Sequence, residues 1–385
     1  MTDKKVAVLG STGSVGTQVL DVCGRFGARV VYIAANSNTD LLEQQIRRHK
    51  PLYCAVGDDN KANELEIRVK DTDTKIIKGY KALCDTAAEV DCDLVYNAVS
   101  GKNGLLPTLS VLASGKTLAL ANKESMVLAG EIVNKTAKEH NAEILPVDSE
   151  HCAIFQCLKN GRADEVKRIL LTCSGGPFFG YSFEKLENVS LEDTMKHPTW
   201  NMGKKITVDS ATLANKGLEI IEAMHLFRVP YEKIKVLIHR QSIVHSMVEY
   251  NDNSVIAQLS VPDMRYPGQY ALTYPERLEG VINELDLTKT PLTFDEPDES
   301  AFPMLALARH CAKQGGILPC AFNAANEAAV DMFLRKKIGF NDIYRVTESV
   351  VSHTANEPVK SVEQIISCDG ICRKLAYDKE KTGIK

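Results

Sequence analysis

Short apolar runs rich in β-branched residues alternate with helical patterns over the first 150 residues. Helices are predicted over 15–25 and 40–50, and Pro51 stops the second of them. Alternation of helices with strands that are apolar throughout is typical of a parallel, doubly wound sheet. The predicted strands are 6–9, 30–34, 54–56, 94–97, 117–120 and 143–147.

The pattern changes near residue 149. A helix over 149–159 is followed by a strand over 166–172 and by a loop-rich stretch with a helix near 210–227; further strands are predicted over 236–238, 245–250 and 254–260. Long strands after helices indicate an α+β domain with a largely antiparallel sheet. A polar, proline-containing linker and a C-terminal helical bundle follow, with helices over 301–311, 320–335 and 341–353. The predicted domains are 1–148, 149–273 and 301–385, with the linker at 274–300.

Composition excludes several classes of function. The formal net charge is −4 and no basic run is present, which argues against nucleic acid as a partner. No apolar stretch reaches the roughly 18 residues of a membrane span, and the first apolar run is too short for a signal peptide. The eleven cysteines are scattered and form no CxxC pair, which favours reduced thiols in a cytoplasmic enzyme.

A glycine-rich turn, Gly10-Ser11-Thr12-Gly13-Ser14-Val15-Gly16, lies between the first predicted strand and helix. In this context glycines allow close backbone approach to a pyrophosphate, which favours dinucleotide binding over a simple turn. The second strand ends in Asn36-Ser37-Asn38, with no carboxylate before Asp40. A carboxylate there would bind the ribose 2′-hydroxyl of NAD, so its absence favours NADP.

Three polar segments follow predicted strands or lie on predicted helices. Asn122-Lys123-Glu124 is either the start of a capped helix or part of a ligand site at a strand end. Asp148 and Glu150 either cap a helix or offer paired oxygens to a hard cation such as Mg²⁺ or Mn²⁺. In the third segment Asn215, Lys216 and Glu219 share one helical face, which is either a surface salt-bridge face or a site. Gly217 would be costly inside that helix unless close approach is needed, which favours function.

Two loops add candidate ligand groups. Ser174-Gly175-Gly176 leaves a strand, and its hydroxyl and amides are suited to a phosphate, although a simple turn explains it equally well. The stretch from His197 to Lys204 has no helical period and contains the only tryptophan, Trp200. We expect either a core tryptophan or a lid that covers a ligand.

Taken together and in order, these motifs resemble those of the 1-deoxy-D-xylulose 5-phosphate reductoisomerase family. The matching stretches are 10–16, 121–125, 146–151, 174–178, 197–203, 209–219, 241–247, 262–265 and 324–327, so the resemblance covers nearly the whole chain. It implies an N-terminal NADPH domain, a central catalytic domain with most contacts of a homodimer, and a C-terminal helical bundle. It also implies the conversion of a sugar phosphate, 1-deoxy-D-xylulose 5-phosphate, to 2-C-methyl-D-erythritol 4-phosphate.

The resemblance implies a role for each candidate residue. The metal ligands for Mg²⁺ or Mn²⁺ are Asp148, Glu150 and Glu219. Lys123 lies near metal and substrate oxygens and is grouped with them as catalytic. The other substrate contacts are Ser149, Ser174, His197, Trp200, Ser210, Asn215 and Lys216, and the mobile flap is 196–204 with His197, Trp200 and Met202. The NADPH contacts are Thr12, Gly13, Ser14, Val15, Asn36, Ser37, Asn38, Asn122, Glu124 and Gly203.

Two positions depart from the family pattern. Asn36 stands where glycine is expected, which puts the shape of the adenosine pocket in doubt, and Arg240 stands where proline is common. Two other functions stay open at this point. One is a semialdehyde- or homoserine-type NADP oxidoreductase, with Cys173 as a conceivable nucleophile, and the other is a non-catalytic NADP sensor that would need no metal ligands.

Overall fold

The computed structural model of the protein describes residues 1–200 and 202–382. These residues form two compact units, each assembled from separate stretches of the chain. Unit 1 comprises Met1–Ser125, Val133–Cys152 and Asp263–Asn283. Unit 2 comprises Met126–Ile132, Ala153–Pro262 and Glu284–Lys385. Two helices, α6 (Lys123–Glu139) and α7 (Ser149–Cys157), contribute residues to both units.

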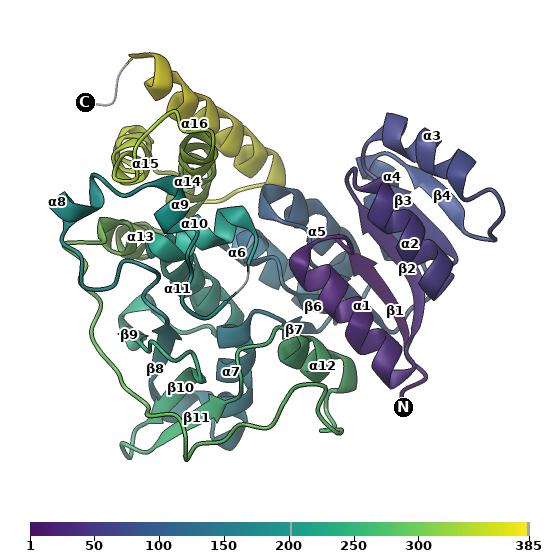
Figure 1. The fold of residues 1–385 in the computed structure, drawn as a ribbon, viewed down its shortest axis with the longest axis horizontal. Coiled ribbons are helices and arrows are strands. Elements are labelled where there is room, and N and C mark those ends of the chain that lie inside the picture. Colours follow the sequence, from purple (N-terminus) through teal and green to yellow (C-terminus); the bar gives the residue numbers. More distant parts are fainter. Residues whose placement is uncertain (201, 383–385) are drawn as a thin grey trace. The chain divides into compact units, whose positions relative to one another are not determined.

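Unit 1 is built on a seven-stranded parallel sheet, whose strands lie side by side in the order β4-β3-β2-β1-β5-β6-β7 (Figure 1). The order reverses at β1, which pairs with β2 on one side and β5 on the other. This is the doubly wound arrangement that the sequence predicts, and all six predicted strands are present. The strands are β1 (Lys5–Leu9), β2 (Arg29–Ala35), β3 (Tyr53–Val56), β4 (Lys75–Lys78), β5 (Leu94–Asn97), β6 (Thr117–Leu120) and β7 (Ile144–Pro146).

Helices connect successive strands of this sheet, as parallel pairing requires. The two helices predicted here are present as α1 and α2. A late segment, α12 (Arg265–Thr273), also belongs to unit 1, where Gly268 accepts a hydrogen bond from the buried Tyr96 hydroxyl (2.8 Å). The remaining helices of unit 1 are α1 (Ser14–Phe26), α2 (Thr39–His49), α3 (Asp59–Arg68), α4 (Tyr80–Glu89) and α5 (Leu105–Ala113), with a 3₁₀ turn at Gly101–Gly104.

Unit 2 contains a four-stranded sheet in the order β11-β10-β8-β9. Its strand β10 is antiparallel to both β11 and β8, whereas β8 and β9 are parallel. The prediction of a largely antiparallel sheet is therefore confirmed. The strands are β8 (Val166–Cys173), β9 (Ile234–Ile238), β10 (Val244–Tyr250) and β11 (Val255–Leu259), and 3₁₀ turns occupy Leu158–Asn160, Ala163–Glu165 and Tyr231–Lys233.

The helix predicted near 210–227 is present but begins later than expected, because two helices occupy this stretch. The first, α10 (Lys204–Ala211), ends before Leu213, whose φ of 61° is left-handed and breaks the helical hydrogen-bond ladder. The Thr212 hydroxyl then accepts a hydrogen bond from the Ala214 amide (3.3 Å) at the start of α11 (Ala214–Phe227). Two short helices, α8 (Phe183–Leu186) and α9 (Leu191–Thr194), precede α10.

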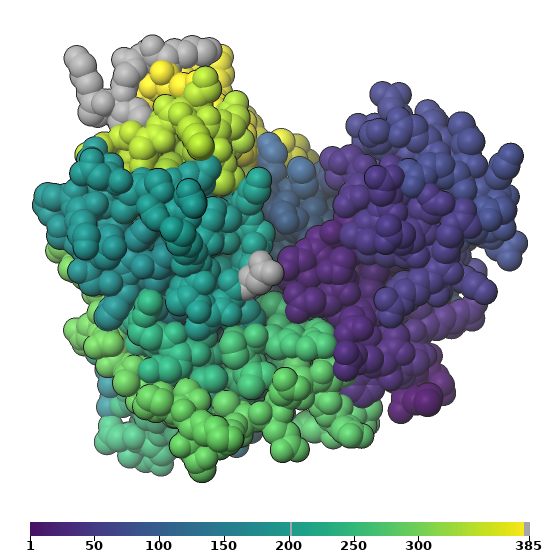
Figure 2. Space-filling model, viewed as in Figure 1, coloured from purple at the N-terminus to yellow at the C-terminus, as the bar shows by residue number. Residues whose placement is uncertain are grey.

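The C-terminal part of unit 2 is helical, and α14, α15 and α16 lie together in Figure 1. The three predicted helices are present as α13 (Pro303–Gln314), α14 (Leu318–Leu334) and α15 (Asp342–His353); α16 (Val362–Thr382) was not predicted. Most side chains over 274–300 are exposed, and this segment is visible at the surface in green (Figure 2). Within residues 1–200 and 202–382, no helix is both long and apolar enough to cross a bilayer.

Candidate active site

The glycine-rich turn of unit 1 is as tight as a dinucleotide loop requires. Gly10 has a φ of 76°, and a Cβ there would lie 2.4 Å from the Ala98 carbonyl oxygen after β5. A Cβ on Gly16 would lie 2.2 Å from the Gly10 carbonyl oxygen. Gly13 precedes α1 and no side chain caps this N-terminus, so first-turn amides face the loop without a side-chain acceptor. The turn lies where the strand order reverses, the position at which such sheets bind ligands.

The loop after β2 carries small polar groups and no unpaired carboxylate. Asn36 and Ser37 are exposed, and the Asn38 side chain caps α2 by accepting a hydrogen bond from the Leu41 amide (3.3 Å). The first carboxylate, Asp40, is paired with Arg68 (2.8 Å). Its charge is therefore partly neutralised, which favours a cofactor with a 2′-phosphate at this strand end.

Asn122 organises the loops that follow β5 and β6. Its amide nitrogen donates to the carbonyls of Val99 (2.7 Å) and Gly101 (2.9 Å) and to Glu124 (2.9 Å). Its side-chain oxygen caps α6 by accepting from the Ser125 amide (2.9 Å). The capped-helix interpretation of this segment is thus correct. The helix cap does not exclude a ligand site, because the contacts of Asn122 also hold the backbone of Val99 and Gly101 beside the glycine-rich turn.

Lys123 and Asp148 form a nearly buried ion pair in unit 1, with 2.9 Å between Nζ and Oδ2. A lysine at the first position of a helix is opposed by the helix dipole, and its burial adds a desolvation cost. The other oxygen of Asp148 caps α7 by accepting from the amides of Glu150 (3.1 Å) and His151 (3.4 Å). It also lies 3.0 Å from His151 Nδ1. Such an arrangement, costly for stability alone, is typical of a functional carboxylate.

Glu150 lies in the first turn of α7, next to Ser149, whose hydroxyl donates to its carboxylate. Both side chains are partly exposed. Asp148 and Glu150 therefore lie within one helical turn, as the sequence predicts for a helix that begins at Ser149. Oxygen donors this close suit a hard divalent cation.

In unit 2 the Ser174-Gly175-Gly176 loop meets His197 and Ser210. His197 Nε2 lies 3.0 Å from the Ser174 hydroxyl and 3.1 Å from the Ser210 hydroxyl. The Ser174 hydroxyl accepts a hydrogen bond from the Gly176 amide (3.1 Å). Burial, and secondarily the charge of Arg240, lower the pKa of His197 to about 4. A neutral imidazole and two hydroxyls converge here, in a form that can bind phosphate oxygens.

The segment predicted as a flap contacts the rest of unit 2 through His197 and through the Thr199 hydroxyl, which lies 3.1 Å from the Ser242 hydroxyl. His197 Nδ1 accepts from the amides of Thr199 (3.3 Å) and Trp200 (3.0 Å). The Trp200 ring lies 6.1 Å from the His245 ring and is only partly buried, so it is not a core tryptophan. Met202 is partly exposed and Gly203 is exposed at the start of α10. Residue 201 lies outside the described residues.

Helix α11 presents a buried carboxylate with two donors. Glu219 accepts hydrogen bonds from Asn215 and from Lys216, which are four and three residues before it. Lys216 and Glu219 are 2% and 1% exposed, so the surface salt-bridge interpretation is wrong. A buried ion pair is weak evidence for stability, whereas a buried lysine beside a partly buried amide can supply donors to an anion.

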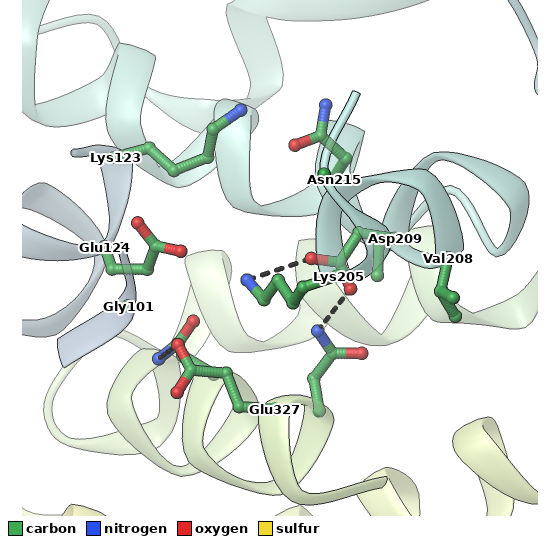
Figure 3. Close-up of polar contacts among 12 residues, drawn as sticks. Gly101, Lys123, Glu124, Lys205, Val208, Asp209, Asn215 and Glu327 are labelled. Carbon is green, nitrogen blue, oxygen red and sulfur yellow. Dashed lines mark hydrogen bonds and ion pairs between the residues drawn. The ribbon is translucent and has the colours of Figure 1, made fainter. Parts of the chain in front are cut away.

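Sequence reasoning gave no role to the buried Asp209 next to Ser210. Asp209 accepts a hydrogen bond from Asn326 in α14 (2.8 Å). It also pairs with Lys205 (2.9 Å), as Figure 3 shows. Asn326 is fully buried and lies in the 324–327 stretch that the sequence singled out by resemblance only. The local pattern gave no signal, because Asp209 lies four residues after Lys205 and such spacing predicts an ordinary helix ion pair. These contacts fix the end of α10 that carries Ser210.

The comparisons with known proteins agree along the chain. The family model described as 1-deoxy-D-xylulose 5-phosphate reductoisomerase matches residues 6–130, and models of its C-terminal domains match 144–227 and 259–375. Relatives of that name from Agathobacter rectalis and Clostridium botulinum are 47% and 48% identical to the chain. The alignments cover 97% and 98% of this chain and 98% and 99% of the relatives. The chain belongs to the 1-deoxy-D-xylulose 5-phosphate reductoisomerase family.

Solved structures of the family share the fold. The reductoisomerase from Zymomonas mobilis in complex with NADPH is 40% identical, with a TM-score of 0.92 over 99% of this chain and 100% of that one. A reductoisomerase in complex with NADPH, fosmidomycin and magnesium is 38% identical, with a TM-score of 0.93 over 98% of each chain. The resemblance and the predicted fold class are confirmed. Family membership also decides against the homoserine-type oxidoreductase and the non-catalytic sensor.

Proposed function

We propose that this protein converts 1-deoxy-D-xylulose 5-phosphate to 2-C-methyl-D-erythritol 4-phosphate, using NADPH and a divalent cation. This is the committed step of the non-mevalonate isoprenoid pathway. The observation that carries the proposal is identity of 47–48% to curated reductoisomerases over nearly the whole chain. Two solved relatives contain NADPH, and one of these also holds magnesium.

Asp148, Glu150 and Glu219 are the proposed metal ligands, and the donor chemistry fits a hard cation. All three offer carboxylate oxygens, which suit Mg²⁺ or Mn²⁺ better than a soft metal. In the structure Asp148 and Glu219 are each held by a lysine, Lys123 and Lys216. When bound, the cation polarises the substrate carbonyl and stabilises negative charge on its oxygen.

The substrate phosphate is assigned to Ser174, Ser210, Asn215 and Lys216. Their hydroxyl, amide and ammonium groups supply the donors that a phosphate dianion needs. His197 joins the two serines in the structure and can donate a hydrogen bond to the same anion. Binding energy from the phosphate, which does not react, is then available to close the flap over the reacting carbons.

The remaining chemistry is a rearrangement followed by a reduction. One carbon–carbon bond beside the carbonyl breaks and another forms, by retro-aldol and aldol steps or by a 1,2-shift, to give an aldehyde. NADPH held by the glycine-rich turn would supply the hydride for the aldehyde carbon, and a proton would go to the aldehyde oxygen. Lys123 and Glu150 are the proposed groups that hold and move protons on the substrate oxygens, while Trp200, Met202 and the rest of the flap exclude water.

NADPH is assigned to the glycine-rich turn and its neighbours in unit 1. The proposed contacts of the pyrophosphate, at the N-terminus of α1, are Thr12, Gly13, Ser14 and Val15. The proposed contacts of the 2′-phosphate are Asn36, Ser37 and Asn38, and the pairing of Asp40 with Arg68 supports them. Asn122, Glu124 and Gly203 complete the proposed contacts.

The experiment that tests the proposal follows the absorbance of NADPH at saturating 1-deoxy-D-xylulose 5-phosphate and Mg²⁺, with NADH as the comparison. We expect oxidation of NADPH with formation of 2-C-methyl-D-erythritol 4-phosphate, and a KM for NADH at least about tenfold higher, because NADH lacks the 2′-phosphate. Oxidation without that product would contradict the proposed reaction. Equal use of NADH would contradict the assignment of Asn36, Ser37 and Asn38.

Two further parts of the proposal concern the whole protein. We propose a homodimer and a cytoplasmic location, the second from the many cysteines, none of which forms a disulfide among the described residues. Light scattering of the purified protein tests the first: twice the mass of the 42.4 kDa chain is expected, and a monomer would contradict it.

A further inference from the structure

Arg240 lies against the loop to which the substrate phosphate is assigned. It follows β9 after one residue, and its Nη1 donates to the carbonyl oxygens of Ser174 and Gly176, both at 2.6 Å. Gly175 and Gly176 have φ values of 75° and 66°, so the loop adopts a backbone that few other residues tolerate. A guanidinium that bridges two carbonyls across this loop fixes the direction of the amides and of the Ser174 hydroxyl.

The charge of Arg240 is not balanced by an acidic partner. Over residues 1–200 and 202–382, no aspartate or glutamate pairs with it, and its other contact is the Phe179 ring, 5.2 Å from the guanidinium carbon. The side chain is half-buried, and this burial lowers its pKa. A cation that is partly removed from water without a carboxylate is costly unless an anion binds nearby.

The positive charge of Arg240 acts on His197, the side chain that contacts both Ser174 and Ser210. The pKa of His197 is lowered first by burial and then by the charge of Arg240. His197 Nε2 contacts both Ser174 and Ser210, so the positive charge acts at the place where these side chains converge. An anion bound there would be attracted by the same charge.

We propose that Arg240 is a positioning residue of the phosphate site, which also supplies positive charge to it. The bridge to Ser174 and Gly176 holds the loop in its anion-binding form, and the charge attracts the phosphate dianion. The inference rests on the proposed function, because it takes the ligand to be the phosphate group of the substrate. It goes beyond that function by adding a cation that is not among the assigned phosphate contacts and that acts through the loop carrying Ser174.

Three variants separate the charge from the bridge. Arg240→Met removes both, Arg240→Gln keeps an amide donor without charge, and Arg240→Lys keeps the charge with a single ammonium group. The control is Arg162→Met, which removes an exposed arginine of unit 2 that pairs with the neighbouring Asp164 and Glu165. Circular dichroism confirms that each variant is folded before it is assayed.

We expect KM for 1-deoxy-D-xylulose 5-phosphate to rise about 10- to 100-fold in Arg240→Met and Arg240→Gln, with a smaller change in kcat. Arg240→Lys should retain part of the affinity, and Arg162→Met should match the wild type. The inhibition constant of inorganic phosphate should rise in parallel with KM. A fall in kcat with KM unchanged would overturn the proposal.

A spectroscopic readout separates charge from loop structure. In ¹³C-histidine-labelled protein, with His197→Asn to assign the signal, the pKa of His197 should rise in the Met and Gln variants and stay low in Arg240→Lys. An unchanged pKa in all three would overturn the role of the charge. If phosphate binding depends on Arg240 but the substrate is not turned over, the proposed function fails and the anion site stands. If turnover is normal and KM is insensitive to all three variants, the inference fails alone.

Discussion

Gly217 gives the sharpest test of helix packing around the candidate site. A Cβ at this position of α11 would lie 2.3 Å from the Cβ of Ala308 in α13, whereas carbon atoms in ordinary contact are about 3.5–4.0 Å apart. Ala308 is fully buried, so it cannot turn into solvent. In Gly217→Ala the two helices must therefore separate by about 1 Å or more. Lys216 and Glu219 flank this position, and the separation would move them too.

The magnitude follows from two opposing effects. Overpacking of this kind costs about 1–3 kcal/mol, whereas replacing glycine by alanine inside a helix contributes about 1 kcal/mol of stability. We expect Gly217→Ala to lower the free energy of unfolding by up to about 2 kcal/mol. An unobstructed helical glycine would instead give a gain of about 1 kcal/mol. Combining the change with Ala308→Gly removes the steric clash, so the double variant should be more stable than the sum of the single effects by about 1–3 kcal/mol.

Urea unfolding of the wild type, both single variants and the double variant measures this coupling. Circular dichroism follows the whole chain, and the fluorescence of Trp200, the only tryptophan, reports on unit 2. Stabilisation by Gly217→Ala, or strict additivity in the double variant, would refute the close approach of α11 and α13.

Three other predictions follow from single contacts. Asn326→Ala removes a donor from the buried Asp209 carboxylate and should cost about 1.5–3 kcal/mol in urea unfolding; a cost below about 0.5 kcal/mol would refute the role of this hydrogen bond. The pKa of His197 is lower in the folded protein (about 4) than in the unfolded chain (about 6.5), so the unfolded state binds more protons between these values. Stability should therefore fall as the pH drops from about 6.5 towards 4, by less in His197→Asn than in the wild type, and equal slopes in urea midpoints would contradict this. Gly16→Ala places a Cβ 2.2 Å from the Gly10 carbonyl oxygen and should weaken NADPH binding at least about tenfold in a fluorescence titration; an unchanged Kd would show that the turn does not hold the cofactor.

The sequence predicts the sheet of unit 1 well because its inner strands are buried on both faces. β1, β5 and β6 each contain three or four consecutive apolar residues, and such runs between turns are a clear local signal. β4 was missed since it is a four-residue edge strand with lysine at both ends, exposed at each end. Its place in the sheet is decided by pairing with β3 and not by its own pattern.

Two features of unit 2 depend on contacts that a local pattern does not contain. The break between α10 and α11 occurs at Leu213, a residue with good helix propensity that tertiary structure holds in a left-handed conformation. α16 carries exposed apolar side chains at Ile366, Ile371 and Leu375, which obscure the apolar face that packs on α14. Neither the break at Leu213 nor the helix α16 can be predicted without knowing which helices pack against these residues.

For the candidate site, the sequence gives the residue types and the structure gives their partners. Spacing alone predicts that Asn215, Lys216 and Glu219 share a face, and they do. Spacing cannot predict that Lys123 pairs with Asp148, because 25 residues and a whole strand separate them. Long-range pairs of this kind follow only from the order of strands in the sheet.

The measurement that tests the central claim most directly is the metal requirement of NADPH oxidation by 1-deoxy-D-xylulose 5-phosphate. Wild type, Glu219→Gln and the control Glu296→Gln, an exposed glutamate paired with Lys235, are assayed with chelator and then with added Mg²⁺ or Mn²⁺. We predict that wild type and Glu296→Gln are inactive in chelator and recover with either ion, whereas Glu219→Gln loses about 10³-fold or more of kcat/KM at every metal concentration, a loss of about 4 kcal/mol of transition-state stabilisation. Full activity in chelator, or an active Glu219→Gln variant, would contradict the account.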